Sequence, residues 1–230
     1  MQGILLIDKP ISWTSFDVVN YVRRIAATEL GVKPKNLKVG HIGTLDPLAT
    51  GLLVLLIGKE YTTRAQEMSK MDKVYKVEIV LGEITDSFDS ETVPKKFSDK
   101  IPTLEEVQSV VNTFVGIIDQ LPPAYSAIKV DGKRAYKLVR AGVVPDMKPR
   151  SVTIHQIDSL KYEYPKLEFS TNVSSGTYIR SLVNDIGKKL GTGGYMSGLQ
   201  RVSIGKFLLS ESISISNLNA ELIKEHILLN

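Results

Sequence analysis

Strand-like and helix-like segments follow one another along this chain without a regular β-α-β rhythm. Alternating or continuous apolar residues predict strands at residues 3–7, 52–57, 74–81, 151–160, 167–173 and 204–208. Apolar residues at helical spacing predict helices around residues 18–25, 104–114, 177–190 and 218–227. A doubly wound parallel sheet needs regular alternation of strands and helices, so the pattern favours an α+β fold.

The composition is that of an ordinary globular protein. Of the 230 residues, 43% are hydrophobic and 23% are charged, which is enough to bury a substantial core. The chain has no cysteine, so disulfides and thiolate chemistry are excluded. The first residues lack the basic segment and apolar core of a signal peptide, and the apolar run at 52–57 is too short to span a bilayer. We therefore expect a soluble, cytoplasmic protein.

The basic charge is concentrated in one segment. The net charge of +4 is modest and is compatible with nucleic-acid binding without requiring it. Within residues 129–150, only Asp131 and Asp146 are acidic. The cations of this segment are Lys129, Lys133, Arg134, Lys137, Arg140, Lys148 and Arg150. Charge alone leaves two interpretations open, a solvated helix face and a surface that contacts RNA.

One carboxylate stands in a loop punctuated by glycine and proline, at residues 41–51. Gly43 permits unusual backbone angles or the close approach of another group, and Pro47 stiffens the chain directly after Asp46. The loop leads into the apolar run at 52–57 and thereby presents Asp46 on a rigid turn. A catalytic carboxylate and an aspartate that merely caps a turn both fit this pattern.

An arginine near the start of a predicted helix provides a second signal. Gly176 ends a strand and Thr177 opens the helix, which places Arg180 in its first turn. A cation there is unfavourable with respect to the helix dipole, so we expect an anionic partner, for which Asp46 is a candidate. The alternative is a surface arginine.

Other chemistries fit poorly. The three histidines, His41, His155 and His226, lack the spacing of metal ligands. The sequence contains neither a phosphate-binding loop of the Gly-rich Lys-Ser/Thr type nor a Gly-x-Ser-x-Gly nucleophile elbow. A glycoside hydrolase would need a second well-placed carboxylate, which the pattern does not indicate.

Several sequence blocks, in order, resemble the TruB family, the bacterial tRNA pseudouridine-55 synthases. The segment Gly40-His41-Ile42-Gly43-Thr44-Leu45-Asp46-Pro47-Leu48-Ala49-Thr50-Gly51 is similar to the family signature. The other blocks are residues 3–15, 73–89, 122–136, 176–182 and 199–201. The resemblance spans residues 3–208, with departures at Ile42, where a small or hydroxyl residue is usual, and at Val173, where cysteine is common.

The resemblance implies a pseudouridine synthase fold, with a mixed, mainly antiparallel sheet and a central catalytic cleft, and chemistry without metal or cofactor. It implies isomerisation of the T-loop uridine of tRNA by base flipping, glycosidic cleavage, base rotation and carbon–carbon bond formation. Asp46 would be the essential aspartate, Arg180 its partner, and Tyr75 a residue that stacks on the base and helps to remove the carbon-5 proton. The further expected substrate contacts are His41 for base extrusion, Tyr178 and Leu199 in the pocket, and Lys129, Lys133 and Arg134 on the RNA backbone.

The same resemblance implies a catalytic domain at residues 1–208 and a short C-terminal extension at 209–230 in place of a full PUA domain. We expect a monomer that acts on the T-arm of tRNA without an obligatory protein partner, metal or membrane. Two other functions remain open. One is that of a guide-dependent relative within a ribonucleoprotein, and the other is that of an RNA-folding chaperone.

Overall fold

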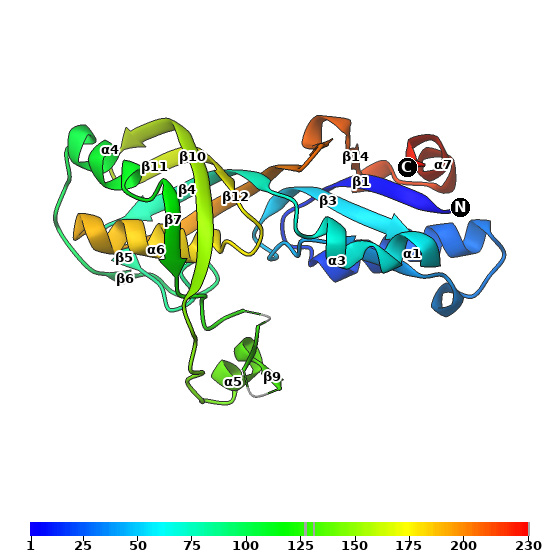
Figure 1. Ribbon diagram of the computed structural model, residues 1–230, viewed down its shortest axis with the longest axis horizontal. Coiled ribbons are helices and arrows are strands. Elements are labelled where there is room, and N and C mark those ends of the chain that lie inside the picture. The colour runs from blue at the N-terminus through cyan, green and yellow to red at the C-terminus, as the bar shows by residue number, and fades with distance from the viewer. Residues whose placement is uncertain (127, 131, 230) are drawn as a thin grey trace. The chain divides into compact units, whose positions relative to one another are not determined.

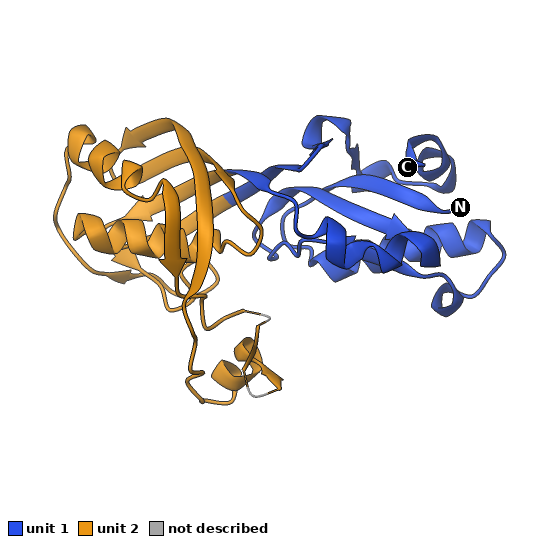
Figure 2. Cartoon of the chain, in the orientation of Figure 1, with its two compact units in different colours: residues 1–75, 199–230 blue, residues 76–198 orange. Residues whose placement is uncertain are grey.

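The computed structural model describes residues 1–126, 128–130 and 132–229. Ala127, in the predicted 122–136 block, and Asp131, an acid of the basic segment, lie outside the described residues. The chain forms two compact units (Figure 2). Unit 1 comprises residues 1–75 and 199–230, and unit 2 comprises residues 76–198.

Unit 1 consists of strands covered by helices (Figure 1). Its strands are β1 (Gly3–Lys9), β2 (Val39–Ile42), β3 (Thr50–Ile57), β13 (Phe207–Leu208) and β14 (Ile213–Ser214), with parts of β4 (Lys73–Leu81) and β12 (Gly194–Ile204). Its helices are α1 (Ser15–Glu29), α2 (Lys59–Thr63), α3 (Ala65–Met68) and α7 (Ala220–His226), with 3-10 turns η1 (Pro34–Asn36), η2 (Leu209–Glu211) and η3 (Ile215–Asn217). β3 pairs antiparallel with β1 and β2 and parallel with β12, while β14 pairs parallel with β1.

The centre of unit 1 is β3, which is buried on both faces. One face packs in a core with α1, and its members include Leu53, Leu55 and Val22. The other face packs in a second core with α2, α3 and β13, through residues such as Val54. Burial on both faces explains why residues 52–57 are continuously apolar rather than alternating. A capping box starts α1, in which Thr14 Oγ1 accepts from the Asp17 amide at 3.1 Å.

Unit 2 is built from β-strands and the helices α4, α5 and α6. Its strands, besides parts of β4 and β12, are β5 (Glu83–Ile84), β6 (Lys95–Lys96), β7 (Gly116–Gln120), β8 (Lys129–Val130), β9 (Lys133–Arg134), β10 (Arg150–Glu163) and β11 (Lys166–Val173). Its helices are α4 (Leu104–Asn112), α5 (Ala135–Arg140) and α6 (Ile179–Leu190). The hydrogen-bonded order is β12-β4-β11-β10-β7, in which β10 is antiparallel to both neighbours.

The helices of unit 2 follow their sequence signals. A capping box opens α4, where the Glu106 amide donates to Thr103 Oγ1 at 3.2 Å. The helix α6 buries Leu182, Val183 and Ile186 and ends at Gly191 in the left-handed conformation. α4 contacts both α6 and β10. The segment that carries β8, β9 and α5 projects away from the sheet of this unit (Figure 1).

The α+β class and the mixed, mainly antiparallel sheet are confirmed, but several details are wrong. His41 and Ile42 belong to β2 rather than to the predicted loop. The strand β7 and most of β12 were not predicted, because their polar and glycine residues hide the alternation. The predicted strand at 204–208 is instead a tight hairpin between β12 and β13.

The described part of the predicted extension, residues 209–229, packs into unit 1. β14 pairs with β1, and the Ile4 and Leu228 backbones exchange two hydrogen bonds, of 3.0 and 2.8 Å. The functional division at residue 208 stays a prediction.

The buried face of α6 gives a stability prediction. Leu182 is fully buried, so Leu182→Ala should lower the free energy of unfolding by about 2–5 kcal/mol. Ile117 on β7 is 78% exposed, so Ile117→Ala should cost less than about 1 kcal/mol. Denaturant unfolding followed by circular dichroism measures both. Equal losses in the two variants would contradict the assigned packing.

Candidate active site

The loop that carries Asp46 is anchored on both sides of this residue. Before it, Ser15 Oγ accepts a hydrogen bond from the Leu45 amide at 2.8 Å and donates one to the Leu45 carbonyl at 3.1 Å. After it, the Ser12 amide donates to the Pro47 carbonyl at 2.8 Å. Asp46 itself is half-buried and takes part in polar interactions. The backbone on either side of the carboxylate is therefore held in place before any substrate binds.

A buried lysine lies against the same loop. Lys9 Nζ donates to the carbonyls of Trp13 at 2.7 Å, Pro10 at 2.8 Å and Pro47 at 3.4 Å. Burial lowers the pKa of Lys9 to about 8, although the negative charge of Asp46 acts in the opposite direction. Lys9 therefore adds a cation and a further anchor to the Asp46 loop.

A second buried cation, Arg201 on β12, contacts the loop and the strand that follows it. Its Nη2 donates to the Gly43 carbonyl at 2.7 Å and its Nε donates to the Leu52 carbonyl at 2.8 Å. Gly43 has a φ of +67°, and a Cβ at this position would lie 2.9 Å from Arg201 Nη1. The predicted need for glycine is therefore confirmed, and the group that approaches Gly43 is a protein side chain.

The remaining predicted residues of unit 1, His41, Tyr75 and Leu199, lie on β2, β4 and β12. The Tyr75 hydroxyl interacts with the guanidinium, and this interaction opposes the lowering of the Arg201 pKa by burial. Burial, followed by the charge of Arg201, lowers the pKa of His41, which keeps the imidazole neutral at neutral pH. The Leu199 carbonyl lies 3.4 Å from Thr50 Oγ1 on β3. The structure thus gathers His41, Asp46, Tyr75 and Leu199 in one unit.

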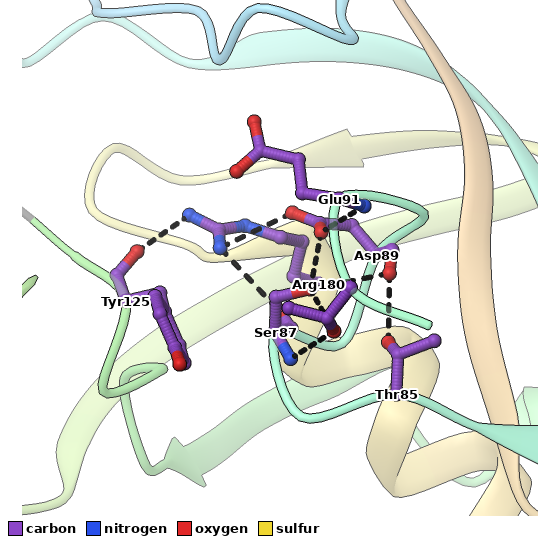
Figure 3. Close-up of polar contacts among 7 residues, drawn as sticks. Thr85, Ser87, Asp89, Glu91, Tyr125 and Arg180 are labelled. Atoms are coloured by element: carbon purple, nitrogen blue, oxygen red, sulfur yellow. Dashed lines mark hydrogen bonds and ion pairs between the residues drawn. The ribbon is translucent and has the colours of Figure 1, made fainter. Parts of the chain in front are cut away.

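Arg180 lies in unit 2 and is buried, with 7% of its surface exposed (Figure 3). Its Nη1 forms an ion pair of 3.3 Å with Asp89 Oδ2 and lies 3.3 Å from the Ser87 carbonyl. Its Nη2 donates to the Tyr125 carbonyl at 3.0 Å. The expectation of an anionic partner is confirmed, and the alternative of a surface arginine is wrong. The pairing of Arg180 with Asp46 stays a prediction.

The partner that sequence reasoning missed is Asp89, which is fully buried. Its Oδ1 accepts from Ser87 Oγ at 2.6 Å and from the Glu91 amide at 3.0 Å (Figure 3). These donors and the arginine compensate for the burial of the charge. Two sequence features could have pointed to Asp89. The block at 73–89 ends at this residue, and the unfavourable position of Arg180 at the start of its helix calls for a nearby anion.

The other predicted residues of unit 2 lie at two places. The Tyr178 amide, at the N-terminus of α6, donates to Gln120 Oε1 at 2.7 Å. Lys129, Lys133 and Arg134 are exposed on the β8–β9 hairpin. Only part of the basic segment is helical, so the interpretation as a single helix face is wrong. Lys129 also lines a hollow of about 220 Å³ together with Lys148, Arg150 and other residues of the segment.

The described residues contain neither a cluster of metal ligands nor a helix that could cross a membrane. Within residues 1–126, 128–130 and 132–229, no group of three or more His, Asp or Glu side chains is arranged to hold a metal ion. In the same part of the chain, no helix combines the length and the apolar character needed to cross a bilayer.

Curated relatives match nearly the whole chain. A tRNA pseudouridine synthase B of Protochlamydia amoebophila is 42% identical, over 97% of this chain and 84% of the relative. Proteins of the same name from Parabacteroides distasonis and Clostridium tetani are 43% and 42% identical. The match to the Parabacteroides protein covers 92% of this chain and 89% of the relative. The match to the Clostridium protein covers 99% of this chain and 76% of the relative.

Solved structures show the same fold. A chain in the crystal structure of a Cbf5–Nop10–Gar1 complex superposes with a TM-score of 0.70 and 28% identity, over 94% of this chain. A chain in an H/ACA ribonucleoprotein bound to a substrate RNA containing 2'-deoxyuridine gives a TM-score of 0.68 and 26% identity, over 97% of this chain. Our chain spans about half of each, 53% and 55% of their length.

Two family models divide the sequence between them. The N-terminal domain of the TruB family pseudouridylate synthases matches residues 28–179. The C-terminal domain of tRNA pseudouridylate synthase B matches residues 180–228. With these matches and with relatives above 40% identity over more than nine-tenths of its length, the chain belongs to the TruB family of pseudouridylate synthases.

Proposed function

We propose that this protein is a tRNA pseudouridine synthase that isomerises the T-loop uridine at position 55. The observation that carries the proposal is the Asp46 loop, which is anchored through Ser15 on one side and through Ser12 and Lys9 on the other. A reacting carboxylate must hold its geometry without help from a metal or cofactor, and such anchoring supplies it. The relatives named tRNA pseudouridine synthase B support the choice of tRNA.

The reaction needs the target uridine outside its stack, because an enzyme cannot reach the glycosidic bond within a stacked loop. The bond between ribose C1′ and uracil N1 then breaks, the base turns, and C5 bonds to C1′. The C5 proton leaves and N1 gains one, so the change is an isomerisation. Asp46 is the carboxylate that drives the cleavage. Attack on the ribose, attack on the base and removal of a ribose proton are all compatible with its place in the loop.

Arg180 is the proposed partner of Asp46 during the reaction. A guanidinium that is fixed by other contacts can present its remaining donors in a defined direction. Asp89, Ser87 and Tyr125 supply such contacts in unit 2. In this proposal, Asp89 orients the arginine, and the arginine keeps Asp46 ionised.

Aromatic and apolar side chains receive the flipped base. Tyr75 stacks on the uracil ring and takes part in removal of the C5 proton, while Tyr178 and Leu199 line the pocket. His41 assists base extrusion, a role that suits a neutral, half-buried imidazole better than a solvated cation. Stacking of a base on an aromatic ring contributes about 1–3 kcal/mol in single-stranded RNA complexes.

Backbone contacts to the T-arm are proposed for the projecting hairpin of unit 2. Lys129, Lys133 and Arg134 are exposed there, and cations on a protruding element suit the phosphates of an RNA stem. Such contacts position the RNA without reading its sequence.

The proposed enzyme works alone, as a cytoplasmic monomer without guide RNA. The higher identity to the tRNA synthases than to the ribonucleoprotein chains supports this choice. Tritium release from a tRNA transcript labelled at uridine C5, with purified protein as the only addition, tests the function and the independence together. No release without added proteins and guide RNA would favour the guide-dependent alternative. RNA refolding without release would favour a chaperone.

Asp46→Asn should abolish tritium release while tRNA binding stays within a few-fold of the parent protein. The amide keeps the size of the side chain but removes its charge and basicity. Glu60→Gln, an exposed carboxylate on α2, is the matched control and should keep full activity. An Asp46→Asn rate within tenfold of the parent would contradict the assignment.

Arg180→Lys should slow the single-turnover reaction by at least about tenfold, or roughly 1.4 kcal/mol. Lysine keeps the charge but cannot reach Asp89 and two carbonyls from one planar group. Arg24→Lys, at an exposed position on α1, is the control for arginine replacement. Equal rates for Arg180→Lys and Arg24→Lys would show that the fork geometry of Arg180 is dispensable.

Neutralising Lys133 and Arg134 together to Gln should weaken tRNA binding and flatten its salt dependence. Each lost phosphate contact lowers the slope of log K against log salt by about 0.7–0.9. The double change of Lys95 and Lys96 to Gln is the control, because these cations also form an exposed two-residue strand in unit 2. Fluorescence anisotropy at several salt concentrations gives the slopes. Identical slopes for both double variants would remove the hairpin from the RNA interface.

A further inference from the structure

The helix α6 begins differently from α1 and α4. The first four amides of an α-helix have no acceptor within the helix itself. In α1 the amide of the N-cap residue Thr14 donates to the Asp17 carboxylate at 2.9 Å, and α4 begins in the same way, with Glu106 as the acceptor, at 2.7 Å. The N-cap of α6 is Tyr178, whose side chain makes no capping hydrogen bond. The start of α6 therefore depends on groups outside the helix.

Gln120 provides the missing acceptor from another element. The Tyr178 amide donates to Gln120 Oε1 at 2.7 Å. Gln120 is the last residue of β7, where it pairs with Arg150 of β10, and only 1% of its surface is exposed. A buried side chain at the end of a paired strand has little freedom to move. The start of α6 is thus tied to the sheet of unit 2 instead of being closed by its own residues.

The side-chain amide of Gln120 serves this single purpose among the described residues. Its Nε2 atom is buried and has no hydrogen-bond partner there. If the amide were turned over, Nε2 would face the Tyr178 N–H, and two donors would oppose each other. The Tyr178 amide therefore fixes the direction in which the Gln120 amide points.

The segment at residues 120–125 also holds the rest of the first turn of α6. Ser181 Oγ donates to the Leu121 carbonyl at 2.7 Å, and Arg180 Nη2 donates to the Tyr125 carbonyl at 3.0 Å (Figure 3). Two prolines between these carbonyls restrict the backbone. Together with the bond from Gln120, these contacts fix the first turn of the helix against one short stretch of chain.

We infer that Gln120 is a positioning residue for the reaction, which sets the place of Arg180 and Tyr178 by holding the start of α6. The role rests on the proposed function, in which Arg180 is the partner of Asp46 and Tyr178 lines the base pocket. Gln120 is buried and acts through these two residues. A displacement of about 1 Å in a reacting site can cost on the order of a hundredfold in rate, so a small shift of the first turn is enough.

Gln120→Met tests the role, because methionine has a similar length but no oxygen acceptor. The single-turnover rate of tritium release should fall by at least about tenfold, or roughly 1.4 kcal/mol. Binding of tRNA should stay at the level of the parent protein, because the proposed backbone contacts lie on the β8–β9 hairpin. A variant that keeps the parent rate would overturn the inference.

Gln120→Glu separates positioning from packing. Glutamate keeps an oxygen acceptor, the kind of group that Asp17 and Glu106 supply in α1 and α4. It should therefore react faster than Gln120→Met. If Gln120 only filled space, the order would be reversed, because a buried carboxylate is costlier than a buried thioether. The reversed order would overturn the inference.

Thr171→Val is the matched control in unit 2. Thr171 is also 1% exposed, and its Oγ1 donates to the Gln156 carbonyl at 2.9 Å. Valine removes this buried hydrogen bond to the backbone of β10 and leaves Gln120 in place. A loss of thermal stability with the parent rate is expected. A rate as low as that of Gln120→Met would show that any such loss in this unit slows the reaction, and the inference would be wrong.

Combining Gln120→Met with Arg180→Lys tests whether the glutamine acts through the arginine. Residues that act through one another give combined losses smaller than the product of the single losses, whereas independent residues give the product. We expect the double variant to be only slightly slower than Arg180→Lys alone. A full product of the two losses would contradict the proposed route.

Hydrogen exchange provides a measurement that does not depend on activity. Peptides over residues 176–182 should exchange faster in Gln120→Met than in the parent, while peptides over residues 103–109, at the start of α4, should not change. If Gln120→Met does not fold, Gln120→Asn replaces it in every assay, because its shorter side chain withdraws the oxygen from Tyr178. Unchanged exchange at residues 176–182 would overturn the inference. A parent protein that releases no C5 label from tRNA would instead contradict the proposed function, whatever the exchange shows.

Discussion

The two-faced burial of β3 is the constraint on which the arrangement of unit 1 depends. A strand with apolar side chains on both faces must be covered on both sides and paired along both edges. α1 covers one face, α2 and α3 cover the other, and β1, β2 and β12 provide the pairing. Asp46 lies in the connection between β2 and β3, so the carboxylate is held beside the buried central strand of the unit.

Two buried arginines illustrate two ways of using a charge inside a protein. Arg180 is balanced by Asp89, and Ser87 and the Glu91 amide in turn satisfy this carboxylate. Arg201 donates hydrogen bonds to the Gly43 and Leu52 carbonyls and forms no ion pair with a carboxylate of the described residues. An arginine that is paired with a carboxylate is suited to holding neighbouring groups in place. An arginine without such a partner exerts its positive charge on the groups next to it.

The use of a few fixed polar groups suits an isomerase. The proposed reaction changes bonds within one nucleotide and needs no redox partner or group carrier. It depends on a few polar groups held at fixed positions, and both units contain such groups within networks of short hydrogen bonds. Lys9, Ser15 and Arg201 do not need to touch the RNA to matter, since each holds the backbone of the loop that carries Asp46.

The sequence by itself determined the α+β class, the buried strand at 52–57 and the family. These features depend on local patterns of apolar, capping and glycine residues, which can be read within one segment. The sequence also required an anion near Arg180 because of its place at the start of a helix. Only the tertiary structure decided that Asp89 is such an anion and that Arg201 binds the Gly43 and Leu52 carbonyls. These contacts join residues about ninety or more positions apart in the chain, and only packing of the sheet and helices within each unit brings them together.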